Sequence, residues 1–559
     1  MPLSRRALLS LSVLPAIPAF TGSAEAPAQG IGFKHGVASG DPLPDRVILW
    51  TRVSGVDKPV DITWQVARDD TFAAVVAQGR CMTDAGRDHT VKVDATGLTP
   101  GTAYVYRFTC QDTPSPIGRT QTLPEQTDDV VLAVASCSLH SNGYFNAYSH
   151  IAGLDRVDAV VHLGDYIYEY GAGPDDYGMG NGRTLGRTPE PPYEIVTLAD
   201  YRIRHAQYKR DQDLQAAHAR APWICVFDDH EICNNPWIGG AENHNPEKGE
   251  GRWWDRKAAA LKAYREWMPI RDTAPGQLSE TIYRSFRFGG IAELIMLETR
   301  LLARSKQLDY ADLKMVDGKP DYQAFGTALS DPGRQLLGPQ QRQWLSDTLT
   351  ASVKDGVCWQ ILGNQVLMAR TPGPDLVRLF GAERTGNVLS VLPVETRRKV
   401  QAMVGLFSNG NTMPFNLDAW DGYPAERERL YHLIKASGAR VVVTSGDSHT
   451  AWANDLHDAA GRQVAVELGV TSVTSPTRFL DAWLPDLQLA KTLAEQNPEI
   501  VAADDAYNGY VRLTLTSDTM TGEWMSVDTI MSQTFTCAAQ KRFVAHATAT
   551  GVSPLTVSG

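Results

Sequence analysis

The sequence contains few cysteines and no long apolar run. Only seven of its 559 residues are cysteine, and no two of them are spaced Cys-x-x-Cys. This pattern disfavours a zinc ribbon, a thioredoxin-type site and a scaffold built from disulfides. After the first 20 residues no segment approaches the roughly 18 consecutive apolar residues of a membrane-spanning helix. We therefore expect a chain without a transmembrane anchor.

Common catalytic signatures and a positive charge are also missing. The chain has no Gly-x-x-x-x-Gly-Lys-Ser/Thr loop, no Gly-x-Ser-x-Gly elbow and no His-Glu-x-x-His helix. Lys and Arg number 53 against 64 Asp and Glu, for a net charge of −11. Because the chain has no global basic footprint, we expect no stable nucleic-acid partner. An anionic substrate would need a local positive centre, such as bound metal ions.

The N-terminus has the pattern of an export signal. Arg5 and Arg6 precede the apolar stretch Ala7–Phe20, and the small residues Gly22–Ala24 follow it. The apolar stretch is too short to span a bilayer but has the length of a cleavable signal core. Paired arginines followed by leucines resemble the twin-arginine type. We predict a signal peptide at 1–24, the twin-arginine export machinery as a partner, and a periplasmic or secreted protein.

Composition and pattern predict two structural regions. With 43% hydrophobic and 21% charged residues, the chain has the composition of a globular protein of two to four domains. Between 30 and 124, strand-like stretches such as Asp61–Val66 and Thr90–Asp94 alternate polar and apolar residues. The run Leu98–Tyr104 turns at Pro-Gly and resembles fibronectin type III modules. We predict a small all-β sandwich there.

From 128 to 535 short apolar runs alternate with helical stretches, which favours a layered α/β fold. We expect helices at Gln207–Ala219, Asp255–Trp267 and Pro339–Leu349. The segments 171–192 and 371–416 have no clear period and are interpreted as long loops.

Five of the apolar runs end at a residue that can bind a metal. The runs and the residues that follow them are Val130–Ser136 before Cys137, Asp158–Gly164 before Asp165, Trp223–Phe227 before Asp228-Asp229-His230, Cys358–Leu362 before Gly363-Asn364, and Arg440–Ser445 before Gly446-Asp447-Ser448-His449. One acidic residue after a strand is usually a turn or a helix cap. Five such ends in series favour a metal site, because α/β sheets place their sites beyond the carboxyl ends of strands.

These segments resemble the PhoD-like alkaline phosphatase family, whose architecture is that of calcineurin-like metallophosphoesterases with several ligands exchanged. The matching stretches are Ala135-Ser-Cys-Ser138, Leu163-Gly-Asp-Tyr-Ile-Tyr-Glu169, Phe227-Asp-Asp-His-Glu231 with Asn234-Asn235, Gly363-Asn-Gln365 and Ser445-Gly-Asp-Ser-His449. The start His35–Pro42, with Trp50-Thr-Arg52, resembles the family's N-terminal β domain. Glu298 stands where the family usually has Asp before Thr-Arg, so a role for Glu298 is left open.

The resemblance implies an Fe³⁺ ion with Ca²⁺ beside it. Thiolate and phenolate ligands suit a transition metal, and hard oxygens suit Ca²⁺. The implied ligands are Cys137, Tyr168 and His449 for iron, Asp165 as a bridge, and Asp229, Asn364 and Asp447. The sequence does not decide whether Asp228 or Asp229 is the ligand. It also does not decide which of the two metals Asp447 would bind. Whether the other six cysteines form disulfides also stays open, although Cys225 and Cys358 lie in apolar runs typical of a core.

The implied activity is that of an exported alkaline phosphatase or phosphodiesterase, which hydrolyses small phosphate esters through a metal-bound hydroxide. Asp165, Asp229 and His230 would be catalytic, with His230 as the proton donor or only an outer contact. Asn234 and Arg300 would bind substrate, although Asn234 could instead cap a loop. Three alternatives stay open: a phospholipase D-like phosphodiesterase acting on lipid head groups, a secreted binding protein with structural metals, and a metal-dependent nuclease.

Overall fold

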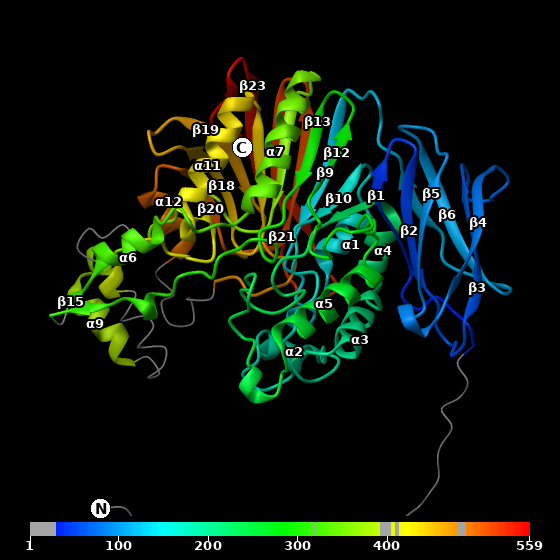
Figure 1. Cartoon of the computed structure of the whole chain (residues 1–559), viewed down its shortest axis with the longest axis horizontal. Coiled ribbons are helices and arrows are strands. Elements are labelled where there is room, and N and C mark those ends of the chain that lie inside the picture. The colour runs from blue at the N-terminus through cyan, green and yellow to red at the C-terminus, as the bar shows by residue number, and fades with distance from the viewer. Residues whose placement is uncertain (1–29, 318, 392–403, 408–412, 479–487, 559) are drawn as a thin grey trace, which may run out of the picture.

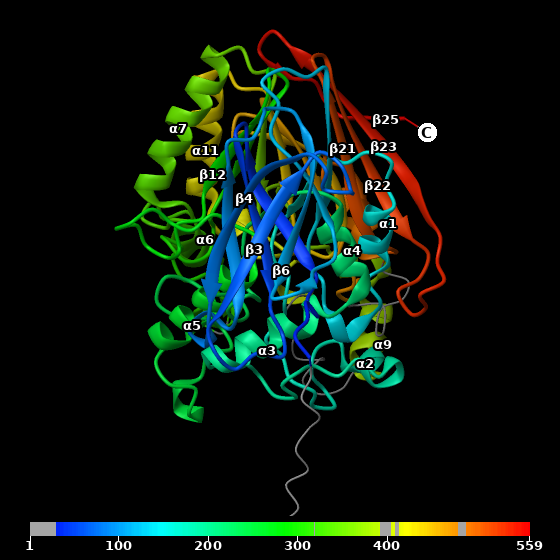
Figure 2. The ribbon, with the colours of Figure 1, turned by 90° about the vertical axis from the view of Figure 1, so that its right-hand side faces the viewer.

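The computed structural model describes residues 30–317, 319–391, 404–407, 413–478 and 488–558 (Figure 1). The predicted signal peptide at 1–24 lies outside the described residues. Across the described residues, two large β-sheets lie face to face, with helices on their outer faces and a smaller β-sheet at one end (Figure 2). This is the layered α/β fold that the alternating pattern predicts.

The N-terminal region packs as two sheets around its own core. Its five-stranded sheet contains β3 (Val60–Ala67), β4 (Val75–Thr83), β6 (Ala103–Cys110), β7 (Thr113–Pro114) and β8 (Gly118–Gln121). The facing strands are β1 (Val37–Leu43), β2 (Arg46–Arg52) and β5 (Thr90–Thr96). Ile62 and Phe108 of one sheet pack with Leu49 and Val93 of the other. This arrangement resembles the predicted sandwich.

The sandwich does not stand apart from the rest of the chain. Strand β1 pairs in parallel with β11 (Trp223–Cys225), with Gly40 opposite Trp223. The strands of the resulting 11-stranded sheet run in the order β24-β23-β22-β21-β9-β10-β11-β1-β2-β5, with β25 paired to β23. The division into domains at about residue 124 therefore stays a prediction, because one sheet runs across that boundary.

The middle of this sheet is parallel and its C-terminal part is antiparallel. The remaining strands are β9 (Asp129–Ala135), β10 (Ala159–His162), β21 (Asn508–Thr516), β22 (Thr519–Val527), β23 (Cys537–Thr548), β24 (Gly551–Val552) and β25 (Thr556–Ser558). Strands β9, β10 and β11 lie side by side and parallel. The sheet thus extends to Ser558, past the predicted end of the second domain at 535.

The second large sheet has seven strands, of which four neighbours are parallel. Its order is β12 (Arg284–Phe288), β13 (Ala292–Met296), β16 (Trp359–Asn364), β17 (Val441–Ser445), β19 (Gln463–Gly469), β18 (Ala451–His457) and β20 (Ile500–Asp504). Val134 and Val161 of the first sheet share a buried core with Ile361 and Val442 of the second. The parallel strands of both sheets therefore meet face to face.

Helices cover the outer faces and the end of the sheets at which the site lies. The helices are α1 (Asn146–Ala152), α2 (Met179–Leu185), α3 (Leu198–Lys209), α4 (Gln212–Arg220), α5 (Trp253–Trp267), α6 (Tyr322–Leu329), α7 (Gly338–Lys354), α8 (Leu376–Phe380), α9 (Ala382–Val391), α11 (Pro424–Ser437) and α12 (Leu489–Gln496). Short 3₁₀ turns lie at Ala85–Arg87, His140–Asn142, Pro246–Lys248, Tyr310–Asp312 and Trp420–Gly422, and β14 (Met315–Val316) pairs with β15 (Lys319–Pro320). Leu345 of α7 and Leu430 of α11 pack against the second sheet.

Two of the predicted helices are confirmed and one is wrong. Helices α5 and α7 contain the predicted stretches. The single helix predicted at Gln207–Ala219 is instead two helices, because Asp211 caps the start of α4 and its side chain accepts the N–H groups of Asp213 and Leu214. Helix α2 interrupts the loop predicted at 171–192, and α8 and α9 lie in the predicted loop 371–416, part of which is outside the described residues.

Candidate metal centre

Four of the five predicted strand ends meet at one place. Strands β9, β10 and β11 deliver Cys137, Asp165 and the Asp228–His230 segment, while β17 of the facing sheet delivers Asp447 and His449. Among the described residues, three overlapping groups have ligand atoms within 4.8 Å of one another: Cys137, Asp165 and His449; Asp165, Asp229 and His230; Asp228, Asp229 and Asp447. Asp165 and Asp229 each belong to two groups, so the groups form one continuous cluster.

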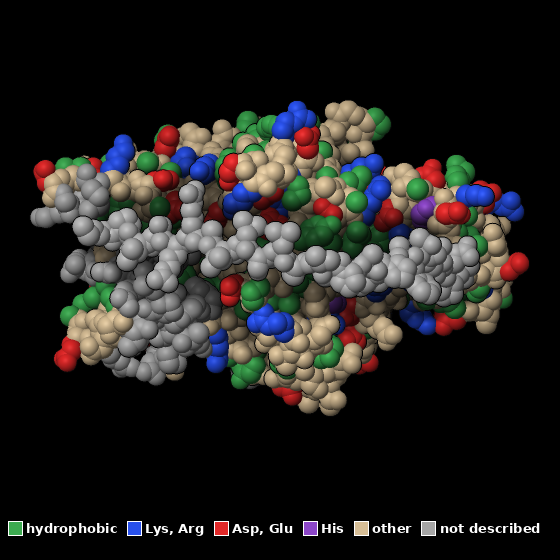
Figure 3. Space-filling model, turned by 90° about the horizontal axis from the view of Figure 1, so that it is seen from below, with side chains coloured by type: hydrophobic (Ala, Val, Ile, Leu, Met, Phe, Trp, Pro, Cys, Tyr) green, Lys and Arg blue, Asp and Glu red, His purple; other side chains and the backbone are tan. Residues whose placement is uncertain are grey.

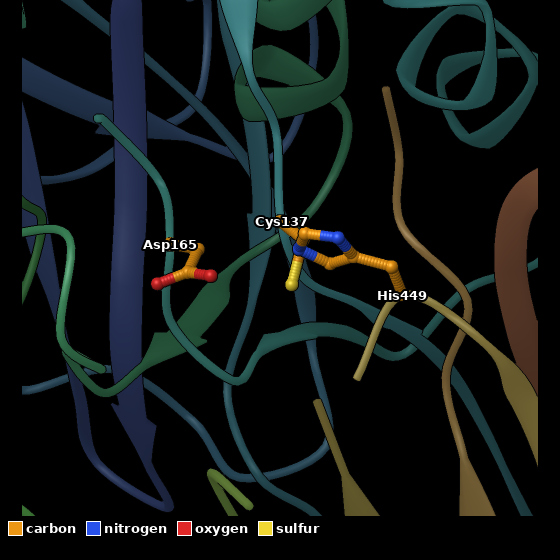
Figure 4. A group of neighbouring side chains, drawn as sticks. All are labelled: Cys137, Asp165 and His449. Carbon is orange, nitrogen blue, oxygen red and sulfur yellow. The ribbon is translucent and has the colours of Figure 1, made fainter. Parts of the chain in front are cut away.

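Figure 4 shows the first of these groups. Cys137, Asp165 and His449 come from three separate loops and both large sheets. The side chains of Cys137 and Asp165 are buried, while His449 is partly exposed. A thiol, a carboxylate and an imidazole together are a donor set suited to a transition metal.

The backbone is strained at the residues that carry the donors. Cys137, Asp165, Asp447 and His449 have φ values of 60°, 55°, 62° and 57°, in the left-handed region. Such a conformation costs a non-glycine residue of order 1–3 kcal/mol and is concentrated at functional sites. Of the glycines that directly precede a donor, Gly164 also has a positive φ, at 113°. The strained residues are, however, mainly the donors themselves.

Some carboxylate oxygens of the buried acidic groups at this site have no hydrogen-bond partner among the described residues. Asp165, Asp228 and Asp229 are each 1% exposed. Burial raises the pKa of Asp165 well above its usual range, and the neighbouring Asp229 raises it further. Among the described residues, Asp228 Oδ2 and Asp229 Oδ1 accept no hydrogen bond. A bound cation would supply both missing interactions, so the donor set fits metal ions.

Tyr168, a predicted ligand, contacts two residues of the cluster. Its hydroxyl donates to Asp165 Oδ2 at 3.1 Å, lies 3.4 Å from His449 Nε2 and accepts a 2.6 Å hydrogen bond from Ser475. Burial lowers the pKa of His449 to about 4, which keeps the imidazole in the neutral form that binds metals. Its Nδ1 lies 3.1 Å from the Pro476 carbonyl, so Nε2 is the nitrogen that faces the cluster.

The sequence missed two residues that contact the predicted donors. The hydroxyl of Tyr177 lies 3.1 Å from His449 Nδ1. Glu169 lies 2.7 Å from His230 Nδ1 through its Oε2. Glu169 belongs to a motif that the sequence had singled out, whereas Tyr177 stands in the segment without a period and gave no signal. Burial alone would lower the pKa of His230, but the carboxylates of Asp229 and Glu169 outweigh burial and raise that pKa well above its usual range.

Arg300 is surrounded by carboxylates rather than by open space. Its guanidinium is 0% exposed and pairs with Asp228, with Asp418 at 2.5 Å and with Asp447 at 3.0 Å. No sequence motif pointed to Asp418. A direct contact between Arg300 and substrate therefore stays an untested prediction, and these ion pairs favour a role in neutralising the cluster.

The structure gives Glu298 a role that the sequence left open. Its carboxylate accepts the backbone N–H groups of Arg300 at 2.8 Å, Leu301 at 2.6 Å and Leu302 at 2.9 Å. The side chain is fully buried. Glu298 therefore fixes the backbone from which Arg300 extends.

Two asparagines of the predicted site have partners within the protein. Asn364 accepts a hydrogen bond from Trp420 Nε1 at 3.1 Å and donates to the Val366 carbonyl. Asn234 is half-buried, and its backbone N–H donates to Glu169 at 2.7 Å. Asn364 as a ligand and Asn234 as a phosphate contact stay predictions.

The cysteines of the described residues form no disulfide. Within the described part of the chain all seven cysteines are unpaired, which answers the question of disulfides. Cys225 is buried as predicted, whereas Cys358 is only partly buried.

No helix of the described residues has the length and apolar character needed to cross a membrane.

The face seen from below mixes both signs of charge (Figure 3). Asp and Glu side chains are interspersed there with Lys and Arg side chains. On the coloured part of this face, neither sign of charge forms one uniform patch. Local positive charge would therefore have to come from the site itself.

Comparisons with known proteins agree with this geometry. A family model described as PhoD-like phosphatase matches residues 132–524, and one described as PhoD-like phosphatase, N-terminal domain, matches residues 19–124. The chain is 35% identical to alkaline phosphatase D of Bacillus subtilis (strain 168) over 576 aligned residues, covering 99% of this chain and 88% of that protein. A solved structure of PhoD superimposes with a TM-score of 0.76 at 31% identity, covering 97% of this chain and 94% of the other.

Proposed function

The chain belongs to the PhoD-like phosphatase family and is a phosphoester hydrolase, and we propose that it hydrolyses phosphate esters with metal ions held at the strand-end cluster. The observation that carries this proposal is the overlap of three donor groups through Asp165 and Asp229. A cluster with two shared carboxylates is suited to holding cations close to one another.

We propose Fe³⁺ and Ca²⁺ as these cations. The thiol of Cys137, the phenol of Tyr168 and the imidazole of His449 would hold iron, because they are softer or stronger donors than carboxylates. Asp165 would lie between the metals. The oxygens of Asp229, Asp447 and Asn364 would suit Ca²⁺. Cations bound there would neutralise the charge that develops on the phosphate oxygens.

The chain's own residues would orient the ester and handle its proton. His230 is 7% exposed, and Glu169 fixes its ring through Nδ1, so Nε2 would hold a proton for the leaving oxygen. Tyr168 stacks on that ring with centroids 4.2 Å apart, which restricts the orientation of the imidazole. Asn234 would contact the phosphate from the loop beyond β11.

The proposal is tested with the full-length protein. Phosphomonoesterase and phosphodiesterase activity would be measured at alkaline pH before and after treatment with a chelator, beside elemental analysis of the purified protein. We expect activity to disappear with the metals and to return when they are restored. Diester substrates with lipid head groups would separate a phospholipase D-like specificity from a general one. Full activity of a metal-free protein would contradict the proposal.

One prediction concerns the colour of the protein. Thiolate and phenolate groups bound to Fe³⁺ absorb visible light through charge transfer, so we expect purified protein to be coloured. Cys137→Ser and Tyr168→Phe should each change or remove part of the absorption band, because each removes one of these donors. The measurement is a visible spectrum with iron and zinc contents from the same sample. Stoichiometric zinc without a visible band would rule out iron.

A second prediction concerns export. We propose that 1–24 directs the protein out of the cytoplasm through the twin-arginine route, so that the mature protein is periplasmic or secreted. Changing Arg5→Lys together with Arg6→Lys should retain the precursor in the cytoplasm, because the paired arginines are the recognition element. Fractionation of cells followed by immunoblotting measures this. An unchanged exported yield of the double variant would point to the general secretory route.

A further inference from the structure

A buried glutamate ties together two of the loops that carry the metal centre. Glu231 is 0% exposed, and its carboxylate accepts three backbone N–H groups. Oε2 accepts from Asp165 at 3.1 Å and from Asp228 at 2.8 Å, and Oε1 accepts from Tyr166 at 2.6 Å. The donors belong to the loops beyond β10 and beyond β11. We propose that Glu231 is a positioning residue, which sets the separation of the Asp165 and Asp229 carboxylates for their cation.

The two loops need such a connection because the sheet no longer joins them. The parallel ladder between β10 and β11 ends with His162 opposite Cys225. One more backbone hydrogen bond follows, from the Val226 N–H to the His162 carbonyl at 3.0 Å. Beyond this point the hydrogen bonds to Glu231 replace the ladder. One of these hydrogen bonds is donated by the backbone N–H of Asp165 itself, whose φ is 55°.

The packing at this point leaves little tolerance for a shift. A Cβ placed on Gly164 would lie 2.2 Å from the Cβ of Asp228. The loops are therefore in direct contact next to the carboxylate of Glu231. A small movement of one loop would change the distance between the donor groups on both. Metal affinity depends on that distance, because donors must be held in the geometry that the cation requires.

Glu231 itself is not placed as a ligand. It belongs to none of the donor groups found among the described residues, although its residue type qualifies. Both of its oxygens are directed at backbone N–H groups. Its effect on a cation would therefore be indirect, through Asp165 and through the Asp228–His230 segment.

Similar buried glutamates support other strand-end loops. Glu298 holds the backbone at Arg300, and Glu467 accepts the N–H groups of Met368 at 2.7 Å and Ala369 at 2.9 Å. Of these three described glutamates, Glu231 alone accepts a backbone N–H from a residue that belongs to the candidate metal-ligand groups. We therefore assign to Glu231, rather than to the other two, the spacing of the carboxylates.

The test is the substitution Glu231→Gln in the full-length protein. An amide keeps the volume but has a single acceptor oxygen, so its NH₂ group must face at least one backbone N–H. This inference rests on the proposed function. Chelator-treated protein would be titrated with Ca²⁺ while the melting temperature and the phosphodiesterase activity are followed. We expect the half-saturating Ca²⁺ concentration in both measurements to rise about 10–100-fold, with kcat at saturating Ca²⁺ close to that of the unchanged protein.

Glu426→Gln provides the matched control. Glu426 lies on helix α11 and is also 0% exposed. Its carboxylate accepts hydrogen bonds from Arg342 at 2.7 and 2.9 Å and from the Leu337 N–H at 3.3 Å. Its substitution should lower the melting temperature and leave the Ca²⁺ response unchanged. If Glu231→Gln does not fold, Glu231→Asp keeps the charge with a shorter side chain and should fold with the same weakened Ca²⁺ response.

The outcomes that contradict the inference are separate from a failure of the proposed function. A Ca²⁺ response of the Glu231 variants equal to that of the control would make Glu231 purely structural. Loss of kcat at saturating Ca²⁺, with an unchanged half-saturating concentration, would place Glu231 in the chemistry instead. If the wild-type protein responds to no metal, the proposed function itself is wrong, whatever the variants do.

Discussion

Asp165→Asn should lower kcat for phosphate esters by at least about 10²-fold, the scale lost when one preorganised electrostatic element is removed. The change keeps the volume of the side chain and removes the negative charge that two donor groups share. Two neighbouring cations repel each other, and an anion between them makes the separation tolerable. The variant should therefore bind its metals poorly, which elemental analysis measures beside steady-state kinetics.

Stability should behave differently from activity in this variant. Burial and the nearby Asp229 both disfavour the charged form of Asp165 when no cation is bound. Removing that charge should therefore not lower the melting temperature of metal-free protein.

Cys137→Ser should have a milder effect on kcat than Asp165→Asn if a harder metal can replace iron.

The control for Asp165→Asn is Asp41→Asn. Asp41 of β1 is 1% exposed, pairs with Arg284 at 2.6 Å and belongs to none of the donor groups found among the described residues. Its substitution should lower stability and leave the metal content unchanged. Turnover near that of the unchanged protein, with full metal content in Asp165→Asn, would show that the active site lies elsewhere.

Arg300→Met should produce the largest loss of stability. Arg300 is fully buried between the carboxylates of Asp228, Asp418 and Asp447. Methionine preserves the apolar part of the side chain but leaves these acidic groups without their cation. Removing one partner of a buried ion pair typically costs about 3–5 kcal/mol, because an uncompensated charge stays behind. Urea denaturation of the metal-free protein measures the free energy of unfolding.

Arg462→Ala serves as the comparison for Arg300→Met. The side chain of Arg462 is 70% exposed and pairs with Asp458 at 3.0 Å. Water screens the charge of the exposed guanidinium, and Asp458 keeps Lys435 as a second partner at 2.5 Å, so the substitution should cost about 0–1 kcal/mol. Adding metal should restore part of the stability of Arg300→Met, because a bound cation replaces some of the lost positive charge. Equal effects of the two substitutions would contradict the neutralising role of Arg300.

The sequence by itself was sufficient for the fold class, the family and most of the donor residues. Strand runs and the residues after them are local features, and parallel strands of one sheet necessarily end on the same side. Cys137 and Asp165 could therefore be assigned to one edge of their sheet, and Asp447 to the corresponding edge of its own sheet, from these local features alone. Helices α5 and α7 followed from their periodicity in the same way.

Only the tertiary structure decided which groups compensate the charges of the site. Asp418 and Glu231 lie far in sequence from some of the groups they contact: Asp418 is 118 residues from Arg300, and Glu231 is 66 residues from Asp165. Their partners are set by how two sheets and their loops pack, which no local pattern encodes. The same packing joins β1 to β11 across the expected domain boundary and places Asp447 and His449 opposite Cys137 and Asp165. Backbone strain at the donors and the desolvation of their charges arise only when distant segments are buried together.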